Sequence, residues 1–506
     1  MNHMSETNIK NEIPAEFWDR MKRVLEEDFD AFYNSYDADN VRALRLNPLK
    51  SNDMVMAEVT SEYCTEPVPW CKDGFYYDSE RRPGKDALHE AGAYYIQEPS
   101  AMAVGTLLDA KPGERVLDMC AAPGGKTTHI AGQMCGEGLL VSSEIDSVRA
   151  KILSRNVERL GIKNCIVTNN APDELAEVFP GFFDRILVDS PCSGEGMFKK
   201  EEAAVSNWSV DNVKMCAERS KGIVDAAVKM LSEGGVLVYS TCTFAPEEDE
   251  YIIKYILDKY PFMRMYPSDD PVFATLLSHN ICEEETFCGD NPGVYRIWPH
   301  IHKGEGHFMA RLVRDSGNFP FLDSNGNSVA IDAGTDNGEK KGFISLRQTE
   351  EHRSKAKKRE KNPGYNTGVT KEQMKTFMSF LEQEPGIDPA RFPVQRLRMS
   401  RDTLWLIPES CPALADLRVI RQGLELGTFK KDRFEPAHAL AMALTGKELE
   451  NSFETEEPEV FLSGNTYQCG EGLKGWIPVT YKDLPLGWGK AGGGVIKNHY
   501  PKGLRR

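Results

Sequence analysis

The sequence predicts an α/β protein built around a doubly wound, mostly parallel sheet, with further domains on either side. Two observations favour this class. Between about residues 89 and 314, short apolar runs that are typical of buried strands alternate with helical patterns. The chain of 506 residues is also too long for one ordinary core, so we expect several domains.

The N-terminal part, residues 1–88, is expected to form a small α+β domain. Apolar side chains recur at helical spacing over residues 13–36, which predicts one amphipathic helix. The stretch VRALRLNPLK follows, and then a segment rich in short turns and aromatic residues, VPWCKDGFYY.

The middle part, residues 89–314, supplies the predicted sheet. Its apolar runs, in chain order, are RVLDMC, GLLVSSEID, CIVTNN, RILVDSPC and GGVLVYSTCTF. A glycine-rich turn and a helix follow the first run, the helix SVRAKILSRNVERLG follows the second, and a helix over residues 211–230 introduces the last. In such a sheet, reactive groups lie at the carboxyl ends of the strands.

The C-terminal part changes character. Residues 315–370 are rich in Gly, Asn, Asp and Ser and then in basic side chains, which is typical of an interdomain linker. Ordered structure is expected again over residues 371–506, where short strands with glycine turns follow the acidic break ETEEPE.

Composition and charge exclude several classes of protein. No apolar run approaches the ~20 residues of a membrane span, and the start of the chain lacks a secretion signal. The 12 cysteines are scattered singly, which argues against a zinc site and against a disulfide scaffold. We therefore expect a cytoplasmic monomer without a metal. With a formal charge of −16, any contact with nucleic acid must use local basic surfaces.

The segment DMCAAPGGKTTHIA is similar to the tail of a nucleotide-phosphate loop. Such a loop requires Gly-x-x-x-x-Gly-Lys-Ser/Thr. Here Cys120 stands where the first glycine belongs, and Pro123 removes a backbone donor. The run RILVDS imitates the magnesium-binding aspartate of an ATPase, so a nucleotide site remains the alternative.

The same turn suits a nucleoside cofactor. A tight turn from strand to helix lets a cofactor approach the backbone, and an acid that ends the next strand binds the ribose hydroxyls. Glu144 ends the run LLVSSE and satisfies that requirement. An adenosine cofactor without pyrophosphate suits S-adenosylmethionine, so a methyltransferase is favoured over an ATPase.

Two cysteines follow two consecutive predicted strands. Asp189 and Cys192 end one strand, and Cys242 ends the next. Taken singly, each cysteine is typical of a small buried hydrophobic residue. Together, both thiols and Asp189 are expected beside the cofactor crevice. A thiolate adds to C6 of a pyrimidine, which lets C5 accept a methyl group, while a nearby acid stabilises the charge on the ring.

The motifs DMCAAPGGKT, DSPCSGEGMF and STCTF, in this order, resemble the Nop/Sun family of RNA cytosine-C5 methyltransferases, and within it the bacterial RsmF type. The resemblance covers the catalytic region closely and nearly the whole chain more loosely. It implies a Rossmann-like domain that uses S-adenosylmethionine to methylate C5 of a cytosine in RNA through a covalent cysteine–C6 adduct. Small-subunit ribosomal RNA is the leading substrate.

The resemblance also implies roles for individual residues. The RNA family uses the cysteine of Thr-Cys, so Cys242 would be the nucleophile, and Cys192, in the Pro-Cys pair that DNA methyltransferases use, would assist product release. Asp189 would contact the cytosine ring, and Lys126 would reach the same pocket. The residues implied in cofactor binding are Cys120, Ala121, Ala122, Pro123, Gly124, Gly125, Lys126, Glu144 and Asp189. The family's usual aspartate after the third strand is absent, so either Asn170 replaces it or the contact is lost.

RNA contacts are expected from both ends of the chain. The stretch RALRLNP resembles the substrate-contacting N-terminal segment of the family, and residues 371–506 resemble the PUA-like region of the RsmF type. The basic side chains expected to bind phosphates are Arg418, Arg421, Lys430, Lys431, Arg433, Lys497, Lys502, Arg505 and Arg506. Solvated charge is the alternative for them.

Two further expectations concern chemistry. His300 and His307 are expected to be structural rather than catalytic. A stacked cytosine hides its C6, so the target must be single-stranded or flipped out. A non-catalytic RNA-binding factor on the same fold is the rival hypothesis, but it would need neither thiol.

Overall fold

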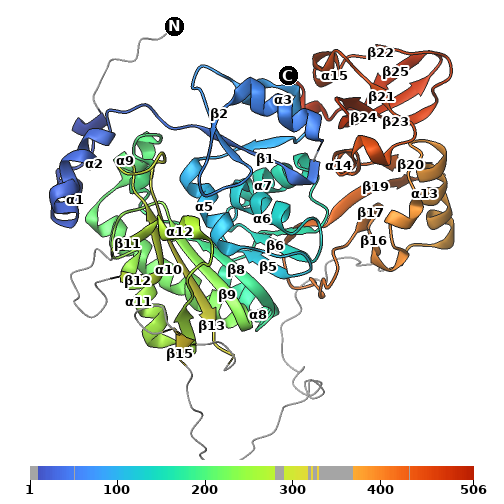
Figure 1. Ribbon diagram of the computed structural model, residues 1–506. Helices are drawn as coiled ribbons and strands as arrows, with labels where there is room; N and C mark the ends of the chain where they lie inside the picture. The colour runs from blue at the N-terminus through green and yellow to red at the C-terminus, as the bar shows by residue number, and fades with distance from the viewer. Residues whose placement is uncertain are drawn as a thin grey trace, which may run out of the picture.

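The computed structural model describes residues 9–50, 52–279, 290–316, 321–322, 328–329, 368–431 and 433–506. A central α/β unit lies between two N-terminal helices and the C-terminal sheets (Figure 1). The predicted linker falls mostly outside the described residues. Within it, β14 (Phe321–Leu322) pairs with β15 (Ser328–Val329).

A ten-stranded sheet forms the centre, in the order β11-β12-β13-β9-β8-β5-β6-β7-β18, with β10 paired to β13. Its parallel strands are β5 (Arg115–Asp118), β6 (Leu139–Ser143), β7 (Cys165–Thr168), β8 (Phe183–Asp189) and β9 (Leu231–Thr241). The antiparallel strands beside β9 are β10 (Met263–Met265), β11 (Leu277–His279), β12 (Asp290–Ile297) and β13 (His307–Arg314). The predicted doubly wound class is confirmed, and the strand order reverses between β5 and β8.

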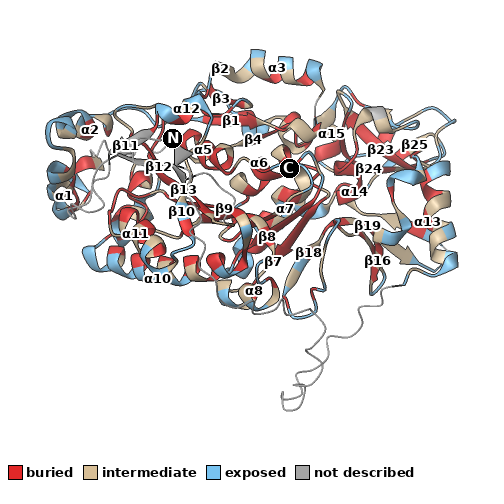
Figure 2. Cartoon of the chain, turned by 60° about the horizontal axis from the view of Figure 1, so that its bottom comes forward, coloured by how far each residue is buried: buried red, intermediate tan, exposed pale blue. Residues whose placement is uncertain are grey.

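Helices cover both faces of this sheet. On one face lie α5 (Pro99–Leu108), α6 (Gly125–Gln133) and α7 (Ser147–Arg159). On the other lie α8 (Pro172–Val178), α10 (Val210–Met230) and α11 (Glu250–Lys259). Successive strand residues enter opposite cores, as Val116 and Leu117 do. The strands are therefore buried on both sides (Figure 2), which explains their continuous apolar runs.

The single N-terminal helix expected over residues 13–36 is wrong. The structure has α1 (Ala15–Leu25) and α2 (Phe29–Ser35), and the chain turns between them at Glu26, whose φ is 46°. A four-stranded antiparallel sheet follows, in the order β2 (Cys64–Pro67), β3 (Gly74–Tyr77), β1 (Ala43–Leu46) and β4 (Tyr94–Ile96), with α3 (Asp53–Tyr63) and α4 (Ala87–Glu90). Because β4 pairs with β1, this sheet extends past residue 88.

The C-terminal region contains two sheets. Helix α13 (Lys371–Gln383) packs with the sheet β16 (Leu397–Ser400), β17 (Thr403–Leu406), β19 (Leu424–Lys430) and β20 (Arg433–Pro436). After α14 (His438–Met442), the second sheet has the order β21 (Phe453–Glu454), β23 (Gly475–Tyr481), β24 (Leu484–Gly492), β25 (Val495–Asn498) and β22 (Tyr467–Gln468), with α15 (Pro458–Leu462).

One C-terminal strand joins the central sheet. Strand β18 (Val419–Gln422) pairs antiparallel with β7 and forms its outer neighbour. The side chain of Arg421 fixes this pairing, because it is 4% exposed and forms an ion pair with Glu158 of α7. In the described part of the chain, no helix is long and apolar enough to cross a membrane.

Candidate active site

A cavity of about 740 Å³ opens at the carboxyl ends of β5, β6, β8 and β9. This is where the strand order reverses, the usual ligand position in such sheets. The predicted site residues that line it are Cys120, Ala122, Glu144, Asn170, Asp189, Cys192 and Cys242. The others, Ala121, Pro123, Gly124, Gly125 and Lys126, belong to the turn after β5 and the start of α6.

The turn after β5 is held by contacts that leave little freedom. Gly124 has φ of 113°, and a Cβ there would lie 3.1 Å from Leu153, so only glycine fits. The carbonyl of Ala122 accepts a hydrogen bond from Arg149 (2.8 Å). Beneath the turn, Thr127 donates to Asp118 (2.6 Å). Burial raises the pKa of Asp118 to about 7, and its Oδ1 has no hydrogen-bond partner within the part of the chain that the structure describes.

Glu144 ends β6 as predicted and is 3% exposed. Its Oε1 accepts from the backbone N–H of Asp146 (2.9 Å), and its Oε2 lies 3.4 Å from Arg149. Next to it, Ile145 is 66% exposed at the cavity wall. In such an arrangement the carboxylate can hold a ribose diol, and the exposed apolar side chain can cover an adenine ring.

Asn170 lines the cavity, but its side-chain amide is already hydrogen-bonded. The Nδ2 donates to Glu174 (2.9 Å), and the Oδ1 accepts from the backbone of Arg418 (3.0 Å). The amide is therefore tied to the C-terminal region. Of the two predicted alternatives, these contacts favour loss of the family's acid contact over its replacement by Asn170.

Asp189 is the polar centre of the site. It pairs with Lys126 (2.8 Å), accepts from Ser240 (2.8 Å) and lies 3.5 Å from His307, a distance too long for a well-formed hydrogen bond. Burial alone would raise the pKa of Asp189, but Lys126 holds it well below its usual value. Burial and then Lys126 lower the pKa of His307. At neutral pH the three groups are a carboxylate, an ammonium and a neutral imidazole.

The two thiols meet across adjacent strands. The sulfurs of Cys192 and Cys242 are 3.4 Å apart, because the parallel strands β8 and β9 end side by side. The hydrogen bond with Cys242 and then burial raise the pKa of the Cys192 thiol well above its usual value. The contact and burial therefore favour the protonated form of Cys192, and either sulfur can be the donor in the contact.

Glu248 holds the loop that carries Cys192. Its carboxyl accepts from the backbone N–H of Ser193 (2.9 Å) and from the Ser193 hydroxyl (2.5 Å), which also contacts Thr243 (2.8 Å). Glu248 is fully buried, and this burial raises its pKa to about 8. These contacts connect the loop that carries Cys192 to the loop that carries Cys242.

A buried ion cluster supports the other cysteine. Thr241 donates to Asp249 (2.6 Å), which pairs with Arg296 (2.8 Å), and Arg296 also pairs with Glu250 (2.9 Å). Burial raises the pKa of Asp249, and Arg296 opposes that rise. The cluster fixes the backbone immediately before Cys242.

The glycine-rich end of the motif DSPCSGEGMF has a packing role. The N–H of Gly196, in the 3-10 helix η5 (Glu195–Met197), donates to the carbonyl of Cys242 (2.9 Å). A Cβ at Gly196 would lie 2.9 Å from the carbonyl of Gly306 and 3.1 Å from that of Cys242. Glu195 accepts from Trp208 and from the N–H of Phe244 and pairs with Arg20 of α1. The motif therefore locks the two cysteine loops together.

Several lining residues escaped the sequence reasoning. Helix α10 presents Asn212 and Arg219 to the cavity, and the segment after η5 adds Glu201 and Ala204, the second from α9 (Glu202–Asn207). The spacing of Asn212 and Arg219 places them on one helical face, which was the available signal. Arg219 is an exposed cation near Cys192 and can attract a phosphate.

The structure corrects part of the predicted RNA surface. Arg45, in RALRLNP, is 2% exposed and bonds Gln97, Gly125 and Thr128, so it is structural, whereas Arg42 is exposed. Arg421 is buried against Glu158 and cannot reach a phosphate.

Other predicted bases are partly neutralised. Their ion pairs within the described residues are Arg418–Glu174, Lys430–Glu435, Arg433–Glu435, Arg506–Glu90 and Arg506–Glu459. His300, outside the cavity lining, packs edge-on against Phe32 and agrees with a structural role.

Among the described residues, no group of three or more potential ligands could hold a metal ion. Four family models match successive parts of the chain. They are the N-terminal domain of 16S rRNA methyltransferase RsmF (residues 13–99), 16S rRNA methyltransferase RsmB/F (105–313), the RsmF first C-terminal domain (379–444) and the RsmF PUA domain (449–506).

Individual proteins give the same picture. The chain is 31% identical to ribosomal RNA small subunit methyltransferase F of Shewanella oneidensis, over 92% of this chain and 90% of the relative. It is 30% identical to the protein of that name from Erwinia tasmaniensis, over 97% of each. A methyltransferase homologue from Pyrococcus horikoshii is 28% identical, with a TM-score of 0.52 over 61% of this chain and 99% of that one. NSun6 from the same organism, solved with SFG, shares the fold at 22% identity and a TM-score of 0.52, over 60% and 98%.

Proposed function

Because the chain belongs to the ribosomal RNA small subunit methyltransferase F family and is therefore an enzyme that methylates ribosomal RNA, we propose that it methylates C5 of a cytosine in small-subunit RNA. The observation that carries this proposal is the pair of thiols, Cys192 and Cys242, in contact beside Asp189. A protein that only bound RNA would need neither thiol.

The cavity residues fit S-adenosylmethionine, which when bound supplies an electrophilic methyl group on a sulfonium. Glu144 would hold the ribose diol, Ile145 would cover the adenine, and the turn from Cys120 would approach the methionine part. The carboxylate of Asp189, which lines the cavity, suits a cation. Asn170 would contribute only a wall.

In the proposed reaction, Cys242 is the nucleophile and its thiolate attacks C6 of the cytosine. The S–H of Cys192 stabilises that thiolate before attack. Asp189 would hold the cytosine ring at N3, with Lys126 fixing its orientation. Methylation at C5 leaves a proton there that must be removed before the Cys242–C6 bond can break.

Cys192 is suited to remove that proton. The contact with Cys242 is the largest cause of its raised pKa, and this contact is lost once the Cys242 sulfur is bonded to C6. The pKa of Cys192 then falls, so its thiol can give its proton to solvent, and the resulting thiolate can accept the C5 proton in the step that frees Cys242 as a thiolate.

The substrate would be a single-stranded or flipped-out cytosine, since C6 must reach a sulfur at the cavity wall. We propose action by a monomer in the cytoplasm. The cysteines of the described residues are free, which agrees with a reducing compartment.

Covalent trapping tests the roles of the two thiols. With ribosomal RNA from cells that lack the enzyme and with S-adenosylmethionine, Cys192→Ala should accumulate a protein–RNA adduct on denaturing gels. Cys242→Ala should form none and transfer no radiolabelled methyl group. Cys135→Ala is the matched control, because it removes an exposed free thiol that lies outside the cavity lining. An adduct that persists in Cys242→Ala would overturn the assignment.

A further inference from the structure

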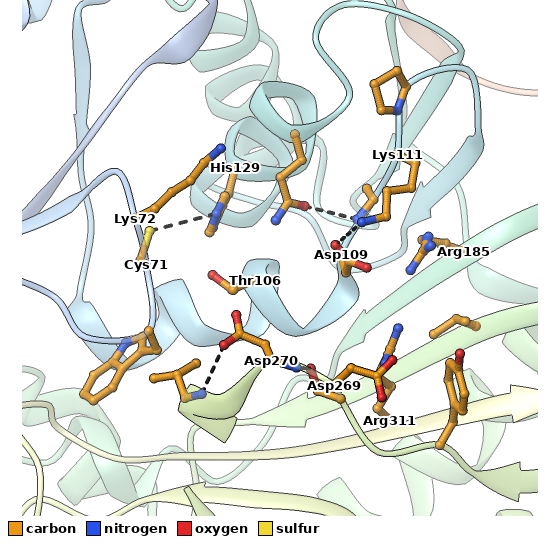
Figure 3. Close-up of a pocket in the computed structure, with 18 of the residues that line it drawn as sticks. Cys71, Lys72, Thr106, Asp109, Lys111, His129, Arg185, Asp269, Asp270 and Arg311 are labelled. Atoms are coloured by element: carbon orange, nitrogen blue, oxygen red, sulfur yellow. Dashed lines mark hydrogen bonds and ion pairs between the residues drawn. The ribbon is translucent and has the colours of Figure 1, made fainter. Parts of the chain in front are cut away.

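A second cavity, of about 690 Å³, lies near the amino ends of the parallel strands of the central sheet, whereas the cofactor cavity lies at their carboxyl ends. Its wall includes Arg185 near the start of β8, Val236 of β9 and the residues that lead into β5. The loop Pro69–Lys72 of the N-terminal domain and the segment around α12 (Pro271–Ala274) close its sides. Figure 3 shows Arg185 and Arg311 on one side of this cavity and Cys71 and Lys72 on the other.

Arg311 is the residue in this wall that most needs explanation. It is 6% exposed, and within the described residues no carboxylate lies in ion-pair distance of its guanidinium. Its Nη1 donates to the carbonyl of Pro267 (3.2 Å), and its Cζ lies 4.5 Å from the centroid of the Tyr266 ring. Its Nε has no hydrogen-bond partner among the described residues. An arginine buried this deeply is rarely found without an anion.

A second guanidinium increases the need for negative charge. Arg185 is 9% exposed and donates to Glu114 (2.7 Å) and to the carbonyl of Leu108 (2.6 Å). After burial, the positive charge of Arg185 is the next cause that lowers the pKa of Arg311, so the two cations feel each other directly. Glu114 forms an ion pair with Arg185. The charge of Arg311 is opposed through the field of Asp109, with which it forms no ion pair among the described residues.

The remaining charges lie at the rim. Lys111 pairs with Asp109 (2.5 Å), and Lys72 is exposed at the opposite side. Asp270 uses one carboxylate oxygen to cap α12 through the N–H of Val272 (3.0 Å). Asp269 appears beside Arg311 in Figure 3, yet no ion pair joins them. The deep wall is thus cationic and the mouth carries both signs.

We propose that this cavity binds a phosphate group between Arg185 and Arg311, at a site separate from the cofactor cavity. Guanidinium groups form paired, charge-assisted hydrogen bonds to phosphate oxygens, and both arginines line this cavity. Thr106 adds a hydroxyl to the same wall. The phosphate belongs either to a free nucleotide-sized molecule or to the backbone of the bound RNA, which share this chemistry.

Calorimetric titration of the full-length protein with inorganic phosphate, at constant ionic strength in chloride, tests the proposal. One saturable site is expected, and Arg311→Gln should weaken it at least about tenfold. Arg314→Gln is the matched control, because it removes an arginine of the same strand that donates to Leu231 outside the cavity. Glu144→Gln, in the cofactor cavity, should also leave phosphate binding unchanged.

A second arm identifies the source of the phosphate. If a single-stranded RNA oligonucleotide displaces phosphate from the wild type, the site holds RNA backbone. If it does not, the site holds a free small anion. Should Arg311→Gln fail to fold by circular dichroism, the exposed Lys72→Glu takes its place and should weaken phosphate binding severalfold. A wild type with no saturable site, or a folded variant that binds as tightly as the wild type, overturns the proposal.

Discussion

The exchange Glu248→Gln tests whether a buried, protonated carboxyl supports the Cys192 loop. Burial raises the pKa of Glu248 from 4.5 to about 8, so the folded state binds this proton more tightly than the unfolded state does. Between those two pH values the folded wild type must therefore lose stability as the pH rises. At 1.36 kcal/mol per pKa unit, the loss reaches about 5 kcal/mol by pH 8.

Glutamine cannot ionise, so Glu248→Gln escapes this loss. Its carbonyl still accepts the Ser193 N–H, and the Ser193 hydroxyl can turn to Thr243, 2.8 Å away. We expect the variant to be no more stable than the wild type near pH 5 and clearly more stable at pH 8.

Thermal unfolding from pH 5 to 8.5 measures this crossover. With a shift of roughly 2–4 °C per kcal/mol, the difference in Tm between the two proteins should change by about 10–20 °C. Glu218→Gln, which makes the same exchange on the exposed side of α10, controls for the lost charge. A Tm difference between wild type and Glu248→Gln that stays constant with pH would refute the reasoning.

Two further variants test the cavity. Glu144→Ala should raise the Kd for S-adenosylmethionine by about tenfold or more, because it removes the proposed charged acceptor of the ribose; unchanged binding by calorimetry would refute that role. Gly196→Ala should lower the free energy of unfolding by about 1–3 kcal/mol and slow adduct formation, because its Cβ meets two carbonyls. Gly222→Ala, on α10 with open space around it, is the matched control, and equal effects of the two exchanges would contradict the packing role.

The parts that the sequence predicted well depend on local pattern and on parallel pairing. Strands β5 to β9 are buried on both sides, so each is a continuous apolar run bounded by turns. Once β8 and β9 are parallel neighbours, Cys192 and Cys242 must end at the same edge, and the structure brings them together.

The parts that the sequence did not predict depend on distant partners. In the sequence, Arg421 is indistinguishable from a surface base. Its burial depends on packing against α7, where it pairs with Glu158, a residue far away in the chain. Arg45 likewise becomes structural only because Gln97 and Thr128 surround it. The break at Glu26 interrupts an unbroken apolar spacing, and no glycine or proline marks it.

The pairing of β18 with β7 has a consequence for synthesis of the protein. As the chain leaves the ribosome, β7 and its parallel neighbours emerge with one outer edge still open, and open edges favour pairing with other chains. The strand that closes this edge is β18 (Val419–Gln422). Residues 169–418 separate it from β7, so it is synthesised long after β7. The outer strand of the catalytic sheet is therefore the last of its strands to be synthesised. A nascent chain that stops before residue 419 leaves the edge of β7 exposed.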